Sequence, residues 1–170
     1  MRGIIPVTGQ VIEALRDQFV DPVSPPLGGV VPEVEHRPGM DVALDGLFVG
    51  DCPGLVWTNV IRLFRTDQFP AESDTIAPCR GTPAAIIQVG AARCVGTVDA
   101  QGYPPSAERM EHDALVGLDD AARLERALCL AARRLEDKNL IHSATWSAAE
   151  PIGPQGGVLA WVMSLTVQLA

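Results

Sequence analysis

The densest group of titratable side chains is Glu111-His112-Asp113, three consecutive residues in a segment with helical periodicity. Carboxylates and an imidazole are the groups that general acid–base catalysis uses. Consecutive residues of a helix point in different directions, however, so these three side chains cannot form one proton relay. The sequence therefore favours a solvated helix face here over a catalytic cluster.

A thiol nucleophile is a second possible chemistry, because Cys94 with His112 or His142 would supply a nucleophile and a base. Any chain with four cysteines and three histidines offers such pairs, and no local motif singles this one out. No Cys-x-x-Cys pair of the kind that zinc sites use occurs among Cys52, Cys79, Cys94 and Cys129. We interpret these residues as four small, mostly buried thiols.

Three other motifs also have structural interpretations. The segment 153–157 is glycine-rich but lacks the Gly-Lys-Ser/Thr of a phosphate loop, so it predicts a turn before a strand. Asp119-Asp120 with Glu125 offers carboxylates, but nothing fixes a coordination geometry for a cation. Core positions are expected for Trp57, Trp146 and Trp161, which fall on predicted strands without interleaved basic residues. We predict no catalytic, cofactor-binding or metal-binding residues, no cofactor and no enzyme activity.

The chain is acidic, with 13 basic and 21 acidic residues and a net charge of −8. That balance disfavours a protein that clamps nucleic acid, but it suits a channel through which DNA slides. Hydrophobic residues make up 47% and charged residues 20%, which is typical of a globular domain. There is no run of roughly 20 apolar residues and no signal-peptide core. We expect a single domain over 1–170, made in a cytoplasm and not bound to a membrane.

The clearest element is a strand from Val158 to Leu169, in which apolar residues recur at every second position. One buried face is predicted for Leu159, Trp161, Met163, Leu165, Val167 and Leu169. Leu140 to Ser147 also alternates, and the 148–157 loop would join the two strands into an antiparallel hairpin. Further strands are predicted at 55–64, covered on both faces, and at 84–95, where small residues including Gly90 would allow close approach of a helix or a neighbouring subunit.

Two helical regions accompany these strands. The first is expected to begin at Thr8 as its N-cap and to end near Val20. The second begins after Ser106, another N-cap, and ends at Asn139. Gly117 and the following aspartates predict a kink, or two helices. Together the elements indicate an α+β fold with one antiparallel or mixed sheet and helices on one face.

Residues 21–54 are rich in proline and glycine and form a long loop or arm within the domain. Inside it, 41–49 reads as a small hairpin, because Asp45-Gly46 suits a two-residue turn. His36 is expected to be exposed. We expect this arm to contact a partner.

Three segments together resemble a known family. They are Val60-Ile61-Arg62-Leu63-Phe64-Arg65 with Phe69-Pro70, then Cys79 with Ala84 to Cys94, and then Ile152 to Gly157 before the last strand. The pattern resembles the neck proteins of long-tailed phages of actinobacteria, a family of tail terminators and head-to-tail connectors. The resemblance covers roughly 56–169, and the order of elements is similar to the lambda-type tail-terminator fold.

The resemblance implies a structural virion protein without catalytic residues, assembled in the host cytoplasm. Such a protein forms a homo-oligomeric ring, sixfold in the terminators, between the head-side connector or stopper and the tail tube protein. Genomic DNA only passes through its lumen. Another neck position, as a stopper or connector, is the first alternative. A small cytoplasmic thiol enzyme and a ligand-binding α+β module are the others.

Overall fold

The computed structural model describes residues 3–40, 47, 51–73 and 80–170. Its two helices are α1 (Ile4–Phe19) and α2 (Ala107–Asp137). The six strands of the described residues are β1 (Val34–His36), β2 (Leu55–Thr66), β3 (Thr82–Cys94), β4 (Ile141–Trp146), β5 (Glu150–Gln155) and β6 (Val158–Leu169). The predicted hairpin at 41–49 lies outside the described residues, apart from Leu47.

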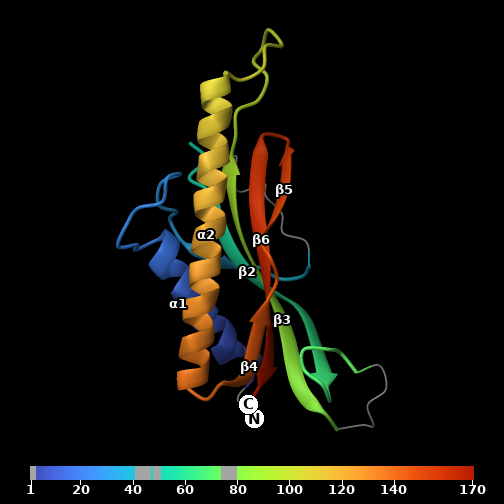
Figure 1. Cartoon of the computed structure of the whole chain (residues 1–170). Helices are drawn as coiled ribbons and strands as arrows, with labels where there is room; N and C mark the ends of the chain where they lie inside the picture. Colours follow the sequence, from blue (N-terminus) through green and yellow to red (C-terminus); the bar gives the residue numbers. More distant parts are fainter. Residues whose placement is uncertain (1–2, 41–46, 48–50, 74–79) are drawn as a thin grey trace.

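All six strands belong to one sheet in the order β1-β2-β3-β6-β4, with β5 also paired to β6. The pairing of β1 with β2 is parallel and every other pairing is antiparallel, so the sheet is mixed. Both helices lie along the same side of the sheet, and α2 extends alongside it (Figure 1). The predicted α+β fold with a mixed sheet is therefore confirmed.

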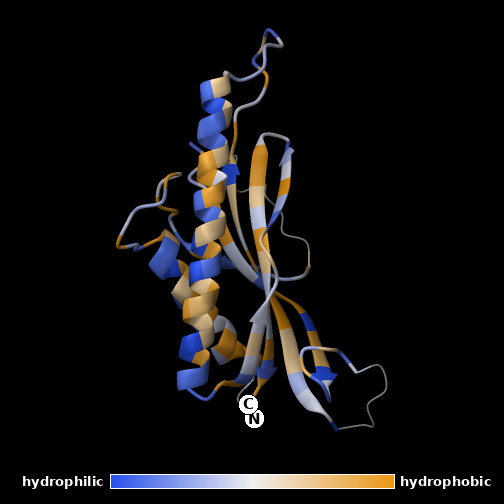
Figure 2. Ribbon diagram, viewed as in Figure 1, coloured by the Kyte–Doolittle hydropathy of each residue, from blue (hydrophilic) through white to orange (hydrophobic). Residues whose placement is uncertain are grey.

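The main core lies between the helices and the sheet. Its largest buried side chains include Phe19 and Leu15 of α1, Leu124 and Leu128 of α2, and Leu165 of β6. Alternate residues of β6 face the helices as predicted, although Leu159 and Trp161, nearest the β5–β6 turn, are only half-buried. Figure 2 shows hydrophobic residues along the strands and on the part of α2 beside α1. Burial of this face is what holds the two layers together.

The opposite face of the sheet is covered only in part. Nearest the β5–β6 turn, which we call the upper end, a second cluster comprises Leu47, Leu55, Trp57, Ala92, Val158 and Ala160. Toward the lower end, this face presents mostly uncharged, half-buried side chains, among them Gln88, Ser164, Thr166 and Gln168. Ile86 and the exposed Arg62 lie in the same row as Thr166, and Arg62 is ion-paired with Glu72. The lower half of this face thus has a largely polar surface without a covering layer in the described chain.

Both helix predictions need correction at particular residues. The first helix begins at Ile4 rather than at Thr8, since proline is tolerated in a first turn and Thr8 instead donates its hydroxyl to the carbonyl of Ile5 (2.9 Å).

The second helix is continuous over 31 residues, so the predicted kink at Gly117 is wrong. A Cβ there would lie 2.7 Å from Nε1 of Trp161, so this glycine lets α2 lie close to β6. Ser106 caps α2 as predicted, accepting from the Arg109 N–H.

The C-terminal hairpin is confirmed, but the expected loop at 148–157 is largely strand β5. Only Gly156 and Gly157 form the turn, and both have positive φ, which glycine adopts without strain. The expectation that the strand at 55–64 is covered on both faces holds only at its upper end, because Leu63 is 62% exposed. The short parallel strand β1 was not predicted.

The indole ring of Trp57 packs against Gly90 of β3 and leaves no room for a side chain there. A Cβ on Gly90 would be 2.2 Å from Cζ2 of Trp57. We expect Gly90→Ala to lower the free energy of unfolding by about 1–3 kcal/mol, because the buried ring must move. The matched control is Gly9→Ala in α1, where nothing lies within 4 Å and where helix propensity predicts a gain of about 0.5–1 kcal/mol. Urea unfolding followed by tryptophan fluorescence measures both, and equal effects would contradict this interpretation.

Candidate functional site

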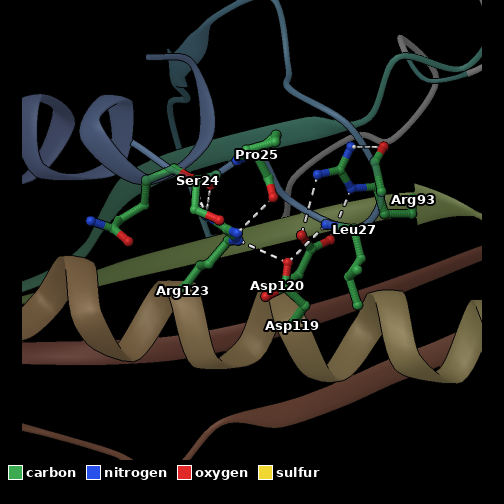
Figure 3. Close-up of polar contacts among 9 residues, drawn as sticks. Ser24, Pro25, Leu27, Arg93, Asp119, Asp120 and Arg123 are labelled. Atoms are coloured by element: carbon green, nitrogen blue, oxygen red, sulfur yellow. Dashed lines mark hydrogen bonds and ion pairs between the residues drawn. The ribbon is translucent and has the colours of Figure 1, made fainter. Parts of the chain in front are cut away.

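Two buried arginines hold the first part of the 21–54 segment and its end against the helix layer (Figure 3). Arg93 comes from β3 and Arg123 from the middle of α2, and each is paired with an aspartate of α2. Segments far apart in the sequence meet at these side chains.

Arg93 is almost fully buried and makes four hydrogen bonds. Its Nε and Nη2 donate to the two carboxylate oxygens of Asp120 at 2.8 and 3.2 Å. Its Nη1 donates to the carbonyls of Gly28 (3.0 Å) and Pro53 (3.4 Å). This one guanidinium therefore holds two points of the 21–54 segment, one near its start and one at its end. Burial raises the pKa of Asp120 above its ordinary value, against the hydrogen bonds and charge of Arg93.

Arg123 lies on α2, one helical turn after Asp119, and makes a similar set of contacts. Its Nε donates to Asp119 (2.8 Å). Its other nitrogens donate to the carbonyl of Gln18 in the last turn of α1 and to those of Ser24 and Pro25 in the loop that follows. Asp119 also accepts the N–H of Leu27 (3.0 Å). Partial burial favours the neutral acid, but the hydrogen bonds from Arg123 and Leu27 and the Arg123 charge outweigh it, so the pKa of Asp119 is lowered.

Replacing Asp119 by Asn tests this network through its pH dependence. The amide oxygen still accepts from Leu27, but the charge opposite Arg123 is gone. We therefore expect the free energy of unfolding to fall by about 1–2 kcal/mol at neutral pH. A lowered folded-state pKa stabilises the fold above the ordinary value of 3.8, and this stabilisation is lost as the pH falls through the folded-state pKa. The difference between wild type and variant should therefore shrink below pH 3.8 in urea titrations. A difference that stays constant down to acid pH would contradict the pairing.

The interpretation of Asp119-Asp120 with Glu125 as a cation site is thus not favoured. The two aspartates bind arginines, and Glu125 is exposed. Across the described residues, no group of three or more His, Cys, Asp or Glu side chains is placed to hold a metal ion.

The prediction that all four cysteines are thiols is wrong, because two of them form a disulfide. Cys52 and Cys94 are bonded to each other, across 42 residues of sequence. Cys129 is a half-buried free thiol, and Cys79 lies outside the described residues. Cys94 and His112 do line one small hollow of about 130 Å³, but the sulfur of Cys94 is already bonded. It therefore offers no thiolate for nucleophilic attack in this state.

The remaining candidates lie apart from one another. Asp113 accepts from the Gly96 N–H (2.7 Å) and from Arg109, whereas Glu111 is exposed. His142 is on β4, and His36 is exposed as predicted. Trp57 is buried, but Trp146 is 38% exposed, so the prediction that all three tryptophans lie in the core is wrong.

Sequence reasoning missed both arginines. A signal existed for Arg93, which is a lone charge within the apolar run of β3. A charge at such a position is rarely buried without a partner. Its partner, 27 residues away on α2, could not be identified from spacing.

No described helix contains an apolar stretch long enough to cross a membrane. No protein-family model matches the chain, and no curated protein matches it.

Proposed function

We propose that this chain is a structural virion protein that forms a ring at the head–tail junction of a long-tailed phage. In that position, as a tail terminator, it caps the tail tube and joins it to the head-side connector. The proposal starts from the resemblance of three sequence segments to phage neck proteins. Another neck position, as a stopper or connector, is the alternative.

The observation that supports the proposal most is the asymmetry of the sheet. Both helices cover one face, whereas the lower half of the other face presents mostly uncharged polar side chains such as Gln88, Ser164 and Thr166. The charged side chain in this register, Arg62, is ion-paired with Glu72. A surface of this kind makes few strong contacts with phosphates, because those need clustered Lys and Arg, and the charge of Arg62 is already matched by Glu72. It suits the wall of a channel through which DNA moves without sticking.

The described parts of the 21–54 segment are held against the domain more firmly than a projecting arm would be. Val31 and Leu47 are buried in the two hydrophobic clusters, and carbonyls of Gly28 and Pro53 bind Arg93. A deletion of 24–52 would therefore disturb folding as well as assembly, and it is a poor test of the function.

Quantitative mass spectrometry of gradient-purified virus particles tests the proposal directly. The expected result is this chain at a fixed low copy number per particle, far below that of the major capsid protein. Antibody labelling in electron micrographs should then place it at the neck, and label on the head side or the tail side distinguishes a connector from a terminator. Absence from particles would overturn the proposal.

A further inference from the structure

Among the described residues, two edge segments of the sheet have no strand paired with their outer side. On one edge, β1 covers only Val56 to Thr58 of β2, and Arg37 adds one bond to the Thr58 carbonyl. No strand of the described chain pairs with the outer side of Val60–Phe64. On the opposite edge, β4 pairs with β6 and has no strand beyond it in the described chain. Unpaired N–H and C=O groups on an edge are a template for a further strand.

These two segments lie at the same level of the sheet. Val60 pairs with Ile87, Ile87 with Leu165 and Leu165 with Trp146. A second row runs in the same way from Phe64 through Ala84 and Gln168 to Ser143. Three successive antiparallel pairings separate β2 from β4, so the two edge strands run in opposite directions.

The rest of both edges is protected. The upper part of β2 is covered by β1, and β5 contains Pro151 and Pro154, which have no N–H to offer a further strand. The open segments also each carry an exposed hydrophobic side chain on the helix side of the sheet. Leu63 is opposite Ala85 and is 62% exposed, and Trp146 is opposite Leu165 and is 38% exposed.

We infer that β4 of one copy pairs antiparallel with Val60–Phe64 of β2 in a second copy, which extends the sheet from subunit to subunit. The inference rests on the proposed ring and names the contact that builds it. Since the edges are different surfaces that match each other, the contact is heterologous and repeats around an axis along the strands. The new seam brings Leu63 and Trp146 to one face. The bulkier helix layer then faces the outside of the ring, and the largely polar lower half of the other sheet face lines its lumen.

Two variants block the two edges separately. Ser147 donates its N–H toward β6, and backbone groups alternate along a strand, so the N–H of Ala144 points outward. Ala144→Pro then removes an edge donor without breaking a bond of the sheet, and Leu63→Asp places a charge on the other edge. Each variant should raise the protein concentration at which subunits assemble by at least about tenfold. Ile152→Asp, at an exposed position of the protected β5 edge, is the matched control and should assemble like the wild type.

Mixing the two blocked variants gives the sharpest result. Leu63→Asp retains a free β4 and Ala144→Pro retains a free β2, so the mixture should form one-to-one dimers that grow no further. Native mass spectrometry and sedimentation measure this, with circular dichroism to confirm that each variant is folded. Blocked variants that assemble like the wild type would overturn the edge pairing and leave the ring itself in place.

Amide hydrogen exchange on the unmodified protein provides a test that does not depend on the variants. Exchange in 60–64 and 143–146 should slow at least about tenfold as concentration rises through assembly, and exchange along β5 should not change. A wild type that stays monomeric at every concentration would overturn the inference. Absence from virus particles with intact edge assembly would overturn only the proposed function.

Discussion

Replacing the buried Arg93 with methionine should lower the free energy of unfolding by about 3–5 kcal/mol. The variant leaves Asp120, which is 1% exposed, without its opposite charge. It also removes the donors to the Gly28 and Pro53 carbonyls. Urea unfolding at neutral pH measures the loss, and Arg93→Lys should recover only part of it, because one ammonium cannot reproduce the planar set of four bonds.

Two controls separate this effect from a general loss of charge. Arg109→Met breaks the Arg109–Asp113 pair at the surface and should lower the free energy of unfolding by no more than about 0.5 kcal/mol. The double variant Arg93→Met with Asp120→Leu removes both buried charges, so it should be more stable than Arg93→Met alone. An Arg93→Met variant as stable as Arg109→Met would show that the network does not hold the segment.

Breaking the Cys52–Cys94 bond is the second change with a large expected effect. A cross-link over 42 residues restricts the unfolded chain, and on the loop-entropy estimate its loss costs about 4 kcal/mol. The bond also holds the residues just before β2 against the end of β3, beside the contact of Pro53 with Arg93. Unfolding of the wild type with and without reductant, together with the variant Cys52→Ala/Cys94→Ala, measures the contribution.

The double variant supplies the control, because its stability should not respond to reductant. Peptide mapping without reduction should recover one peptide pair joined through Cys52 and Cys94. Equal stability of the double variant and the oxidised wild type would contradict the expected contribution, and failure to find the joined peptides would contradict the bond itself.

Much of the fold follows from local patterns in the sequence. The alternation from Val158 to Leu169 predicted β6 and its buried face, since side chains of a strand alternate between faces. Ser106 predicted the start of α2, and Asn139, which adopts a positive φ, predicted its end. The α+β class followed from the order of such elements. Each of these features depends on residues within a few positions of one another.

Only the tertiary structure decided which distant residues meet. Arg93 binds Asp120 and the carbonyl of Gly28, 65 residues away, and Cys52 binds Cys94 across 42 residues. Gly117 predicted a kink by its local propensity, but it lies where α2 approaches Trp161 of β6, and packing overrides the local preference. Partners far apart in the chain leave no periodic signal, because their contact is set by how the layers pack. The sequence by itself therefore determined the elements and the buried face of β6, and the packing of helices on the sheet decided the disulfide, the arginine network and the two open edges.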